Sequence, residues 1–279
     1  MTKTQTYQFV ELNGTTFHYD VRGAGPALVL LHSGVSDLRF WDDQVDVFAQ
    51  RYQVIRYDLR GSGQTPFNAG GTSGHDDLRA LLDHLGVDQV IVVGCSVGGG
   101  MAIDFAQAHP DRVRALVPVA AAVGGYEPEQ LDPAELAERE KIGKAVEEAY
   151  EAGDLERAAW LYAQVWMDGP KRTPDQVDPA ARARAVEMLV TLFKLPEVED
   201  ENFVELEADA AARLGAMTVP TLVIVGDYDV ERLIAHSDFI AQTIPDAQKA
   251  VMHGVAHYPN LEQPAAFNQL VLNFLAEPV

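Results

Sequence analysis

The feature that most constrains the fold of this chain is the alternation of short, unbroken apolar runs with segments of helical periodicity. Residues 26–32 (PALVLLH), 52–58 (YQVIRYD) and 89–94 (QVIVVG) are typical of buried strands, whereas residues 75–87 repeat leucine at helical spacing. Strands that are apolar along their whole length are typical of a parallel sheet with helices on both faces. The sequence therefore predicts an α/β fold.

A long segment in the middle of the chain departs from this alternation. Residues 126–209 are rich in Ala and Glu and include helical patches such as 155–167 (LERAAWLYAQVWM). The strand signal returns at residues 219–229 (VPTLVIVGDYD), and further helix and strand patterns follow it. We therefore predict one α/β core, residues 1–125 and 210–279, with an inserted helical lid at residues 126–209.

Length and composition exclude several classes of protein. The chain has 279 residues, 47% of them apolar, which is enough to fill the core of one large domain. Its formal net charge of -21 argues against binding to nucleic acid or to an anionic membrane surface. No apolar run reaches the roughly 20 residues that span a bilayer, and the first residues lack the apolar region of a secretory signal. We expect a cytoplasmic protein.

The sharpest local signal lies where the strand at 89–94 meets the next helix. Gly94, Ser96 and Gly98 match the pattern G-x-S-x-G, in which a serine occupies a strained strand-to-helix turn. The residues two before and two after that serine must lack a bulky side chain, and both glycines satisfy this requirement. The turn exposes the Ser96 hydroxyl and directs the backbone amide of Val97 toward any anion that forms beside it.

The sequence also supplies an acid and a base for this serine. A serine hydroxyl needs a base that takes its proton, and the base needs a buried acceptor that orients it. Asp227 and Asp229 come at the end of an apolar strand, and His253 and His257 flank the end of the next one. The chain order Ser, Asp, His is typical of one large class of hydrolases.

Five motifs in order resemble the α/β-hydrolase superfamily, in the lidded branch that contains carboxylesterases, enol-lactonases and C–C bond hydrolases. They are LVLLHSG, RYDLRGSGQT, VVGCSVGG, VIVGDYD and GVAHYPNLEQPAAF, and together they extend over nearly the whole chain. The resemblance implies that Ser96 is the nucleophile, Asp229 the acid of G-x-x-D and His257 the base of G-x-x-H. It leaves Asp227 as a turn or cap residue and His253 as a strand-end residue.

The resemblance further implies an oxyanion hole built from backbone amides. Val97 supplies one amide, and the loop His32-Ser33-Gly34 supplies the other. We place this second donor at Gly34, with Ser33 and Val35 as alternatives. Ser33 stands where the family usually has glycine, so the loop departs from the family pattern at that position.

Other residues are expected to contact the substrate or to support the site. The candidate substrate contacts are His32, Val35, Trp160, Trp166 and Tyr258. Aromatic residues at helical spacing in residues 155–167 fit the internal core of the lid better than a substrate pocket. We expect Cys95 to be buried, and residues 58–63 to form a structural turn around a buried ion pair of Arg60.

A serine nucleophile favours acyl transfer over the chemistry of dehalogenases and epoxide hydrolases, which need a carboxylate at this position. We predict hydrolysis of small or medium neutral carboxylic esters, because the acidic lid disfavours anionic substrates. A lactone or C–C bond hydrolase is the alternative, and a catalytically silent binding protein of the same fold is another. No metal or organic cofactor is expected, and the oligomeric state is left open.

Overall fold

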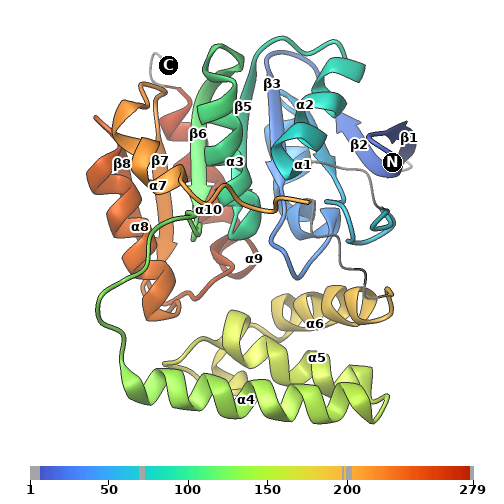
Figure 1. The fold of residues 1–279 in the computed structure, drawn as a ribbon, viewed down its shortest axis with the longest axis vertical. Helices are drawn as coiled ribbons and strands as arrows, with labels where there is room; N and C mark the ends of the chain where they lie inside the picture. Colours follow the sequence, from blue (N-terminus) through green and yellow to red (C-terminus); the bar gives the residue numbers. More distant parts are fainter. Residues whose placement is uncertain (1–6, 69–72, 197, 199–202, 277–279) are drawn as a thin grey trace.

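The computed structural model describes residues 7–68, 73–196, 198 and 203–276, and these residues form one eight-stranded sheet covered by helices (Figure 1). The strands are β1 (Gln8–Leu12), β2 (Thr15–Arg22), β3 (Ala27–Leu31), β4 (Gln53–Tyr57), β5 (Val90–Cys95), β6 (Val113–Val119), β7 (Leu222–Gly226) and β8 (Gln248–Met252). Their order across the sheet is β1-β2-β4-β3-β5-β6-β7-β8. β2 pairs antiparallel with β1 and β4, and the remaining neighbours are parallel. The predicted, mostly parallel α/β architecture is confirmed.

The strand order reverses between β3 and β5. β3 pairs with β4 on one side, where Val29 lies beside Ile55, and with β5 on the other, where Val29 lies beside Val92. Where the strand order reverses, the chain leaves the two neighbouring strands in opposite directions. This opens a crevice at the carboxyl ends of the two strands, and α/β sheets bind ligands in such a crevice. The loop after β3 and the turn at Ser96 after β5 both start at this crevice.

Helices cover both faces of the sheet because successive strand residues point to opposite sides. The helices are α1 (Asp42–Phe48), α2 (Gly74–His84), α3 (Val97–Ala108), α4 (Pro133–Glu151), α5 (Leu155–Ala163), α6 (Pro179–Phe193), α7 (Ala210–Arg213), α8 (Glu231–Thr243), α9 (Pro259–Glu262) and α10 (Pro264–Phe274), with short 3-10 turns at Leu38–Trp41, Pro110–Arg112, Pro174–Gln176 and Leu214–Ala216 and a π turn at Gln164–Asp168. Leu28 and Leu30 share an apolar cluster with α1 and α10, whereas Val29 and Leu31 share one with α2, α3 and α8. Within the described ranges, no helix is long and apolar enough to cross a membrane.

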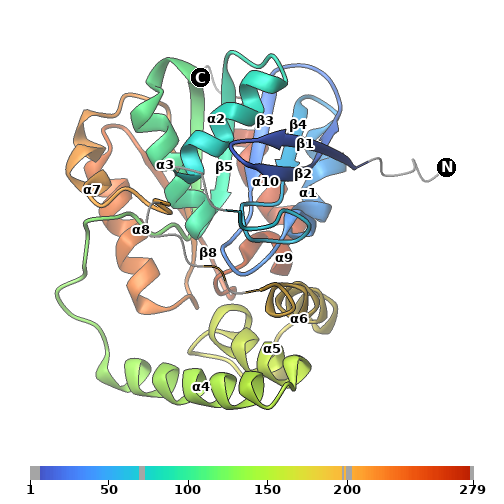
Figure 2. The ribbon, with the colours of Figure 1, turned by 45° about the vertical axis from the view of Figure 1, so that its right-hand side comes forward.

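Helices α4, α5 and α6 form a separate layer beyond one end of the sheet (Figures 1 and 2). The sequence starts α4 and α6 in the same way, because Asp132 and Asp178 cap the first amides and a proline follows each of them. Residues 203–209 then return to the core, where Leu206 packs against the cluster that contains α3. Contact with the core therefore resumes before residue 210, where we placed the boundary of the lid.

Candidate active site

Ser96 occupies a backbone conformation that side chains rarely adopt, with φ 56° and ψ -119°. Its backbone N–H donates to the Val119 carbonyl oxygen at 2.9 Å, which ties the turn to β6. The two flanking glycines are required by close packing of the backbone. A Cβ on Gly94 would lie 2.2 Å from the Gly98 carbonyl oxygen, and one on Gly98 would lie 2.4 Å from the His32 carbonyl oxygen. Only glycine fits at both positions, as the motif predicts.

Asp229 and His257 form a buried pair at the same edge of the sheet. The Nδ1 atom of His257 lies 2.9 Å from Asp229 Oδ2, and each residue is only 1% exposed. The second carboxylate oxygen accepts the Val230 backbone N–H at 2.7 Å. Because both carboxylate oxygens accept, Nδ1 of His257 carries the proton and Nε2 keeps its lone pair.

The buried pair lies next to the strained turn. The Cys95 thiol is 3.7 Å from the carbonyl oxygen of His257, and Cys95 immediately precedes Ser96. Cys95 is fully buried, as the sequence predicts, and desolvation raises the pKa of its thiol well above the ordinary value. The thiol therefore stays protonated at neutral pH and is a poor nucleophile.

The other acid and histidine of the sequence pair with each other at the surface. The Nδ1 atom of His253 lies 3.0 Å from Asp227 Oδ2, and the His253 side chain is 83% exposed. Asp227 also accepts the Gly254 backbone N–H at 2.7 Å. These two candidate His–Asp pairs have similar geometry, but one is buried beside Ser96 and the other is exposed to solvent.

The loop after β3 brings the two candidate oxyanion donors together. A Cβ on Gly34 would lie 3.1 Å from a methyl group of Val97, so these two residues lie close together. His32 holds the loop from inside, because its Nε2 accepts the Leu59 N–H at 2.9 Å and its Nδ1 lies 2.7 Å from the Ser33 carbonyl oxygen. Desolvation lowers the pKa of His32, which is completely buried. The expectation that His32 contacts substrate is therefore wrong; this residue supports the loop.

Comparison with known proteins assigns the chain to a family. Residues 26–264 match the model of the alpha/beta hydrolase fold family. The chain belongs to this family. The match includes β3 to β8, the strained turn, both His–Asp pairs and the inserted helices.

This chain is similar, along nearly its full length, to several differently named hydrolytic enzymes. It is 28% identical to 3-oxoadipate enol-lactonase 2 of Acinetobacter baylyi, over 96% of this chain and 94% of the relative. It is 30% identical to a 2-hydroxy-6-oxononadienedioate/2-hydroxy-6-oxononatrienedioate hydrolase of Cupriavidus pinatubonensis, over 99% and 97% of the two chains. The solved structure of Est816, an N-acyl homoserine lactone degrading enzyme, superimposes with a TM-score of 0.75 at 28% identity, over 96% and 100% of the chains.

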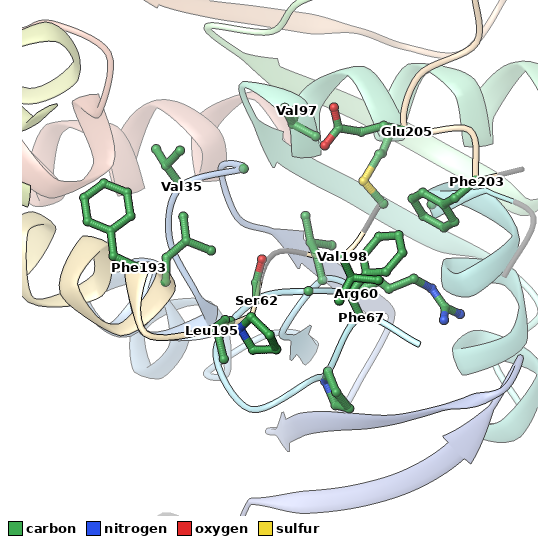
Figure 3. A pocket seen from close by; sticks show the side chains of 18 of the residues that line it. Val35, Arg60, Ser62, Phe67, Val97, Phe193, Leu195, Val198, Phe203 and Glu205 are labelled. Carbon is green, nitrogen blue, oxygen red and sulfur yellow. The ribbon is translucent and has the colours of Figure 1, made fainter. Parts of the chain in front are cut away.

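A cavity of about 820 Å³ opens beside Val97, between the core and the helices of residues 126–209 (Figure 3). Gly34, Val35 and Val97 form the part of its wall that adjoins the strained turn. Most of the remaining wall is apolar or aromatic and comes from separate elements, through Phe67, Met101, Val146, Tyr150, Tyr162, Leu192, Phe193, Leu195 and Phe203. Val35 is the one proposed substrate contact found in this wall.

The charged groups of the cavity are mainly acidic. Arg60 forms a two-pronged ion pair with Asp77, both distances being 2.8 Å, and the two side chains are almost completely buried. This is the buried pair that the sequence predicts. Among the described lining residues, Glu147 and Glu205 are the other charged side chains. Desolvation raises the pKa of Glu205.

The proposed aromatic contacts lie elsewhere. Trp160 is 44% exposed and covers the guanidinium of Arg182, 4.8 Å from its ring centre, so it belongs neither to the cavity wall nor to the lid core. The Trp166 ring lies 4.8 Å from the ring of His257, and its carbonyl oxygen accepts the His257 backbone N–H at 3.2 Å. Tyr258 is 2% exposed and accepts a hydrogen bond from Ser33 at 3.4 Å. Tyr258 is therefore too buried to contact substrate, contrary to the expectation. Trp160 and Trp166 lie outside the described cavity wall, and their contact with substrate stays a prediction.

Proposed function

We propose that this protein is a serine hydrolase of neutral carboxylic esters, with Ser96 as nucleophile, His257 as general base and Asp229 as the acid that orients the base. The observation that supports this most directly is the buried His257–Asp229 hydrogen bond of 2.9 Å beside the strained Ser96 turn. That hydrogen bond leaves Nε2 of His257 as the proton acceptor, which a serine nucleophile needs.

The proposed reaction has two halves. Ser96 Oγ attacks the ester carbonyl carbon and its proton passes to His257, which then gives the proton to the departing alkoxide as the C–O bond breaks. Water repeats the attack on the acyl-enzyme with the same base, and the carboxylic acid leaves. The amides of Val97 and Gly34 stabilise the oxyanion in both halves, by about 3 kcal/mol each.

The charge of the cavity favours neutral substrates. Arg60 is neutralised by Asp77, so Glu147 and Glu205 set the charge that a bound acyl or alcohol group meets. The substrate of the Cupriavidus relative is a dicarboxylate by its name. An anionic group of that kind would be repelled here. Lactones are the second candidate, because two of the relatives are lactone-cleaving enzymes.

Initial rates on p-nitrophenyl esters from acetate to decanoate test the proposal. We expect turnover by the wild type, a loss of at least about 1000-fold in kcat for Ser96→Ala and His257→Ala, and near wild-type rates for His253→Ala, the exposed matched control. Equal rates for wild type and Ser96→Ala on every ester would overturn the ester assignment. Turnover of lactones alone would then support the second candidate, and no turnover at all would indicate a binding protein.

A further inference from the structure

Three potential metal ligands meet where the start of α2 approaches the end of α3. His75 and Asp76 lie in the first turn of α2, and His109 is the residue that ends α3. One ligand atom from each residue lies within 4.8 Å of the other two. The two imidazole ring centres are 6.3 Å apart.

Both histidines have a ring nitrogen without a partner. Nδ1 of His75 and Nε2 of His109 are buried, and neither has a hydrogen-bond partner among the residues that the structure describes. The opposite nitrogen of His75 lies 3.1 Å from Glu207 Oε1, so it carries the proton and leaves a lone pair on Nδ1. Metal-binding histidines characteristically donate their second ring N–H to a carboxylate in this way.

Charges of both signs surround the three residues, because the cations Arg79 and Arg112 and the anion Asp76 all act on His109. Glu207 lies against His75, and its backbone N–H donates to the buried Asp104 carboxylate at 3.0 Å. Arg79 pairs with Asp76 at 3.1 Å, but its side chain is 44% exposed and can turn into solvent. The net charge of -21 adds a general attraction for cations.

We propose that His75, Asp76 and His109 bind one divalent transition-metal ion of the zinc class, with water completing the coordination. Two imidazoles on one tetrahedral ion at about 2.1 Å place their ring centres roughly 5 to 5.7 Å apart, slightly less than the observed 6.3 Å. The ligand atoms must close by about 1 Å, which side-chain rotation provides. Two nitrogen ligands and one oxygen ligand favour zinc over magnesium or calcium.

The proposed ion would join α2 to α3 and take no part in the reaction. Ser96 precedes the first residue of α3 and His109 follows the last, and a helix of 12 residues is about 18 Å long. Ester hydrolysis that depends on Ser96 is therefore expected to be the same with and without the ion. The metal site and the hydrolase proposal can fail separately.

Calorimetric titration of the chelator-treated full chain with zinc chloride tests the site. We expect one zinc per chain with Kd at or below about 10 µM, an increase in Tm with zinc but not with magnesium, and at least a 10-fold weaker Kd in His109→Ala. His253→Ala removes an exposed histidine beside Asp227 and is expected to bind zinc like the wild type. Unchanged affinity in His109→Ala, loss of binding in His253→Ala, or a wild-type Kd above 1 mM would each overturn the proposal.

Discussion

Replacing Asp229 by asparagine is expected to inactivate the protein without unfolding it. The Val230 backbone N–H donates to one Asp229 oxygen at 2.7 Å, so an asparagine at this position must keep its amide oxygen there. Its NH2 group then faces Nδ1 of His257, which has to become an acceptor. The imidazole proton moves to Nε2, and His257 can no longer take the proton of Ser96.

The size of the effect follows from this change of tautomer. Only the small fraction of enzyme in the unfavourable tautomer remains competent, and a change of this kind costs about 1000-fold to 10000-fold in kcat, or roughly 4 to 5.5 kcal/mol of barrier. The assay is kcat on the best p-nitrophenyl ester at saturating concentration. KM should change little, because Asp229 is 1% exposed and does not contact substrate.

Asp227→Asn is the matched control, because the same substitution then falls on the exposed His–Asp pair. His253 is 83% exposed, so we expect less than a twofold change in kcat. Tm measured for both variants separates inactivity from unfolding. A folded Asp229→Asn variant that keeps more than a tenth of the wild-type kcat would refute the proposed tautomer, and a large loss in Asp227→Asn would transfer the role to the exposed pair.

Three further predictions concern buried and cavity charges. Asp77→Ala leaves Arg60 buried without its carboxylate partner and should lower the free energy of unfolding by about 3 to 5 kcal/mol, whereas Lys144→Ala at an exposed pair should change it by less than about 0.5 kcal/mol in the same urea titration. Glu205→Gln should raise kcat/KM about fivefold for an anionic ester and less than twofold for a neutral ester of equal length; equal changes would remove Glu205 from charge selection. Burial raises the pKa of Asp104 to about 6, so the folded state holds this proton more tightly than the unfolded state, and stability falls as pH rises from about 4 to 6. Asp104→Asn should therefore raise Tm more at pH 8 than at pH 4, and a Tm gain that is the same at both pH values would contradict this assignment.

The sequence predicts the sheet and the turn at the carboxyl end of β5 well, because both depend on local patterns. Unbroken apolar runs mark β3, β4, β5 and β7. Gly94 and Gly98 mark the turn, because a Cβ on Gly94 would strike the backbone of Gly98 and a Cβ on Gly98 would strike the backbone of His32 after β3. The spacing G-x-x-H selects His257 over His253 as the base. The structure adds a physical difference between the two, since one is buried and the other is in solvent.

The cavity wall could not be predicted in the same way. Phe67, Tyr150 and Phe203 come from a loop, a helix and a returning segment that meet only in the folded chain. Trp160 is a case in which a local pattern misleads. Its helical spacing suggests that the ring packs inside the lid, but the ring lies over the guanidinium of Arg182, 22 residues later, and the residue is half-exposed. A ring position of this kind depends on tertiary partners, and no local pattern in the sequence reveals them.

The difference between local patterns and tertiary contacts explains why the reaction class of this chain is easier to predict than its substrate. The groups that we assign to the chemistry follow β5, β7 and β8, and the parallel sheet brings the ends of those strands to one edge whatever covers them. The charges that we expect to select a substrate come from α4 and from residues 203–209, which are separate from that edge of the sheet. Between Lys194 and Arg213 the sequence has no basic residue, so no cation from this segment neutralises Glu205. We therefore expect this chain to disfavour anionic substrates even where it shares the sheet with relatives that accept them.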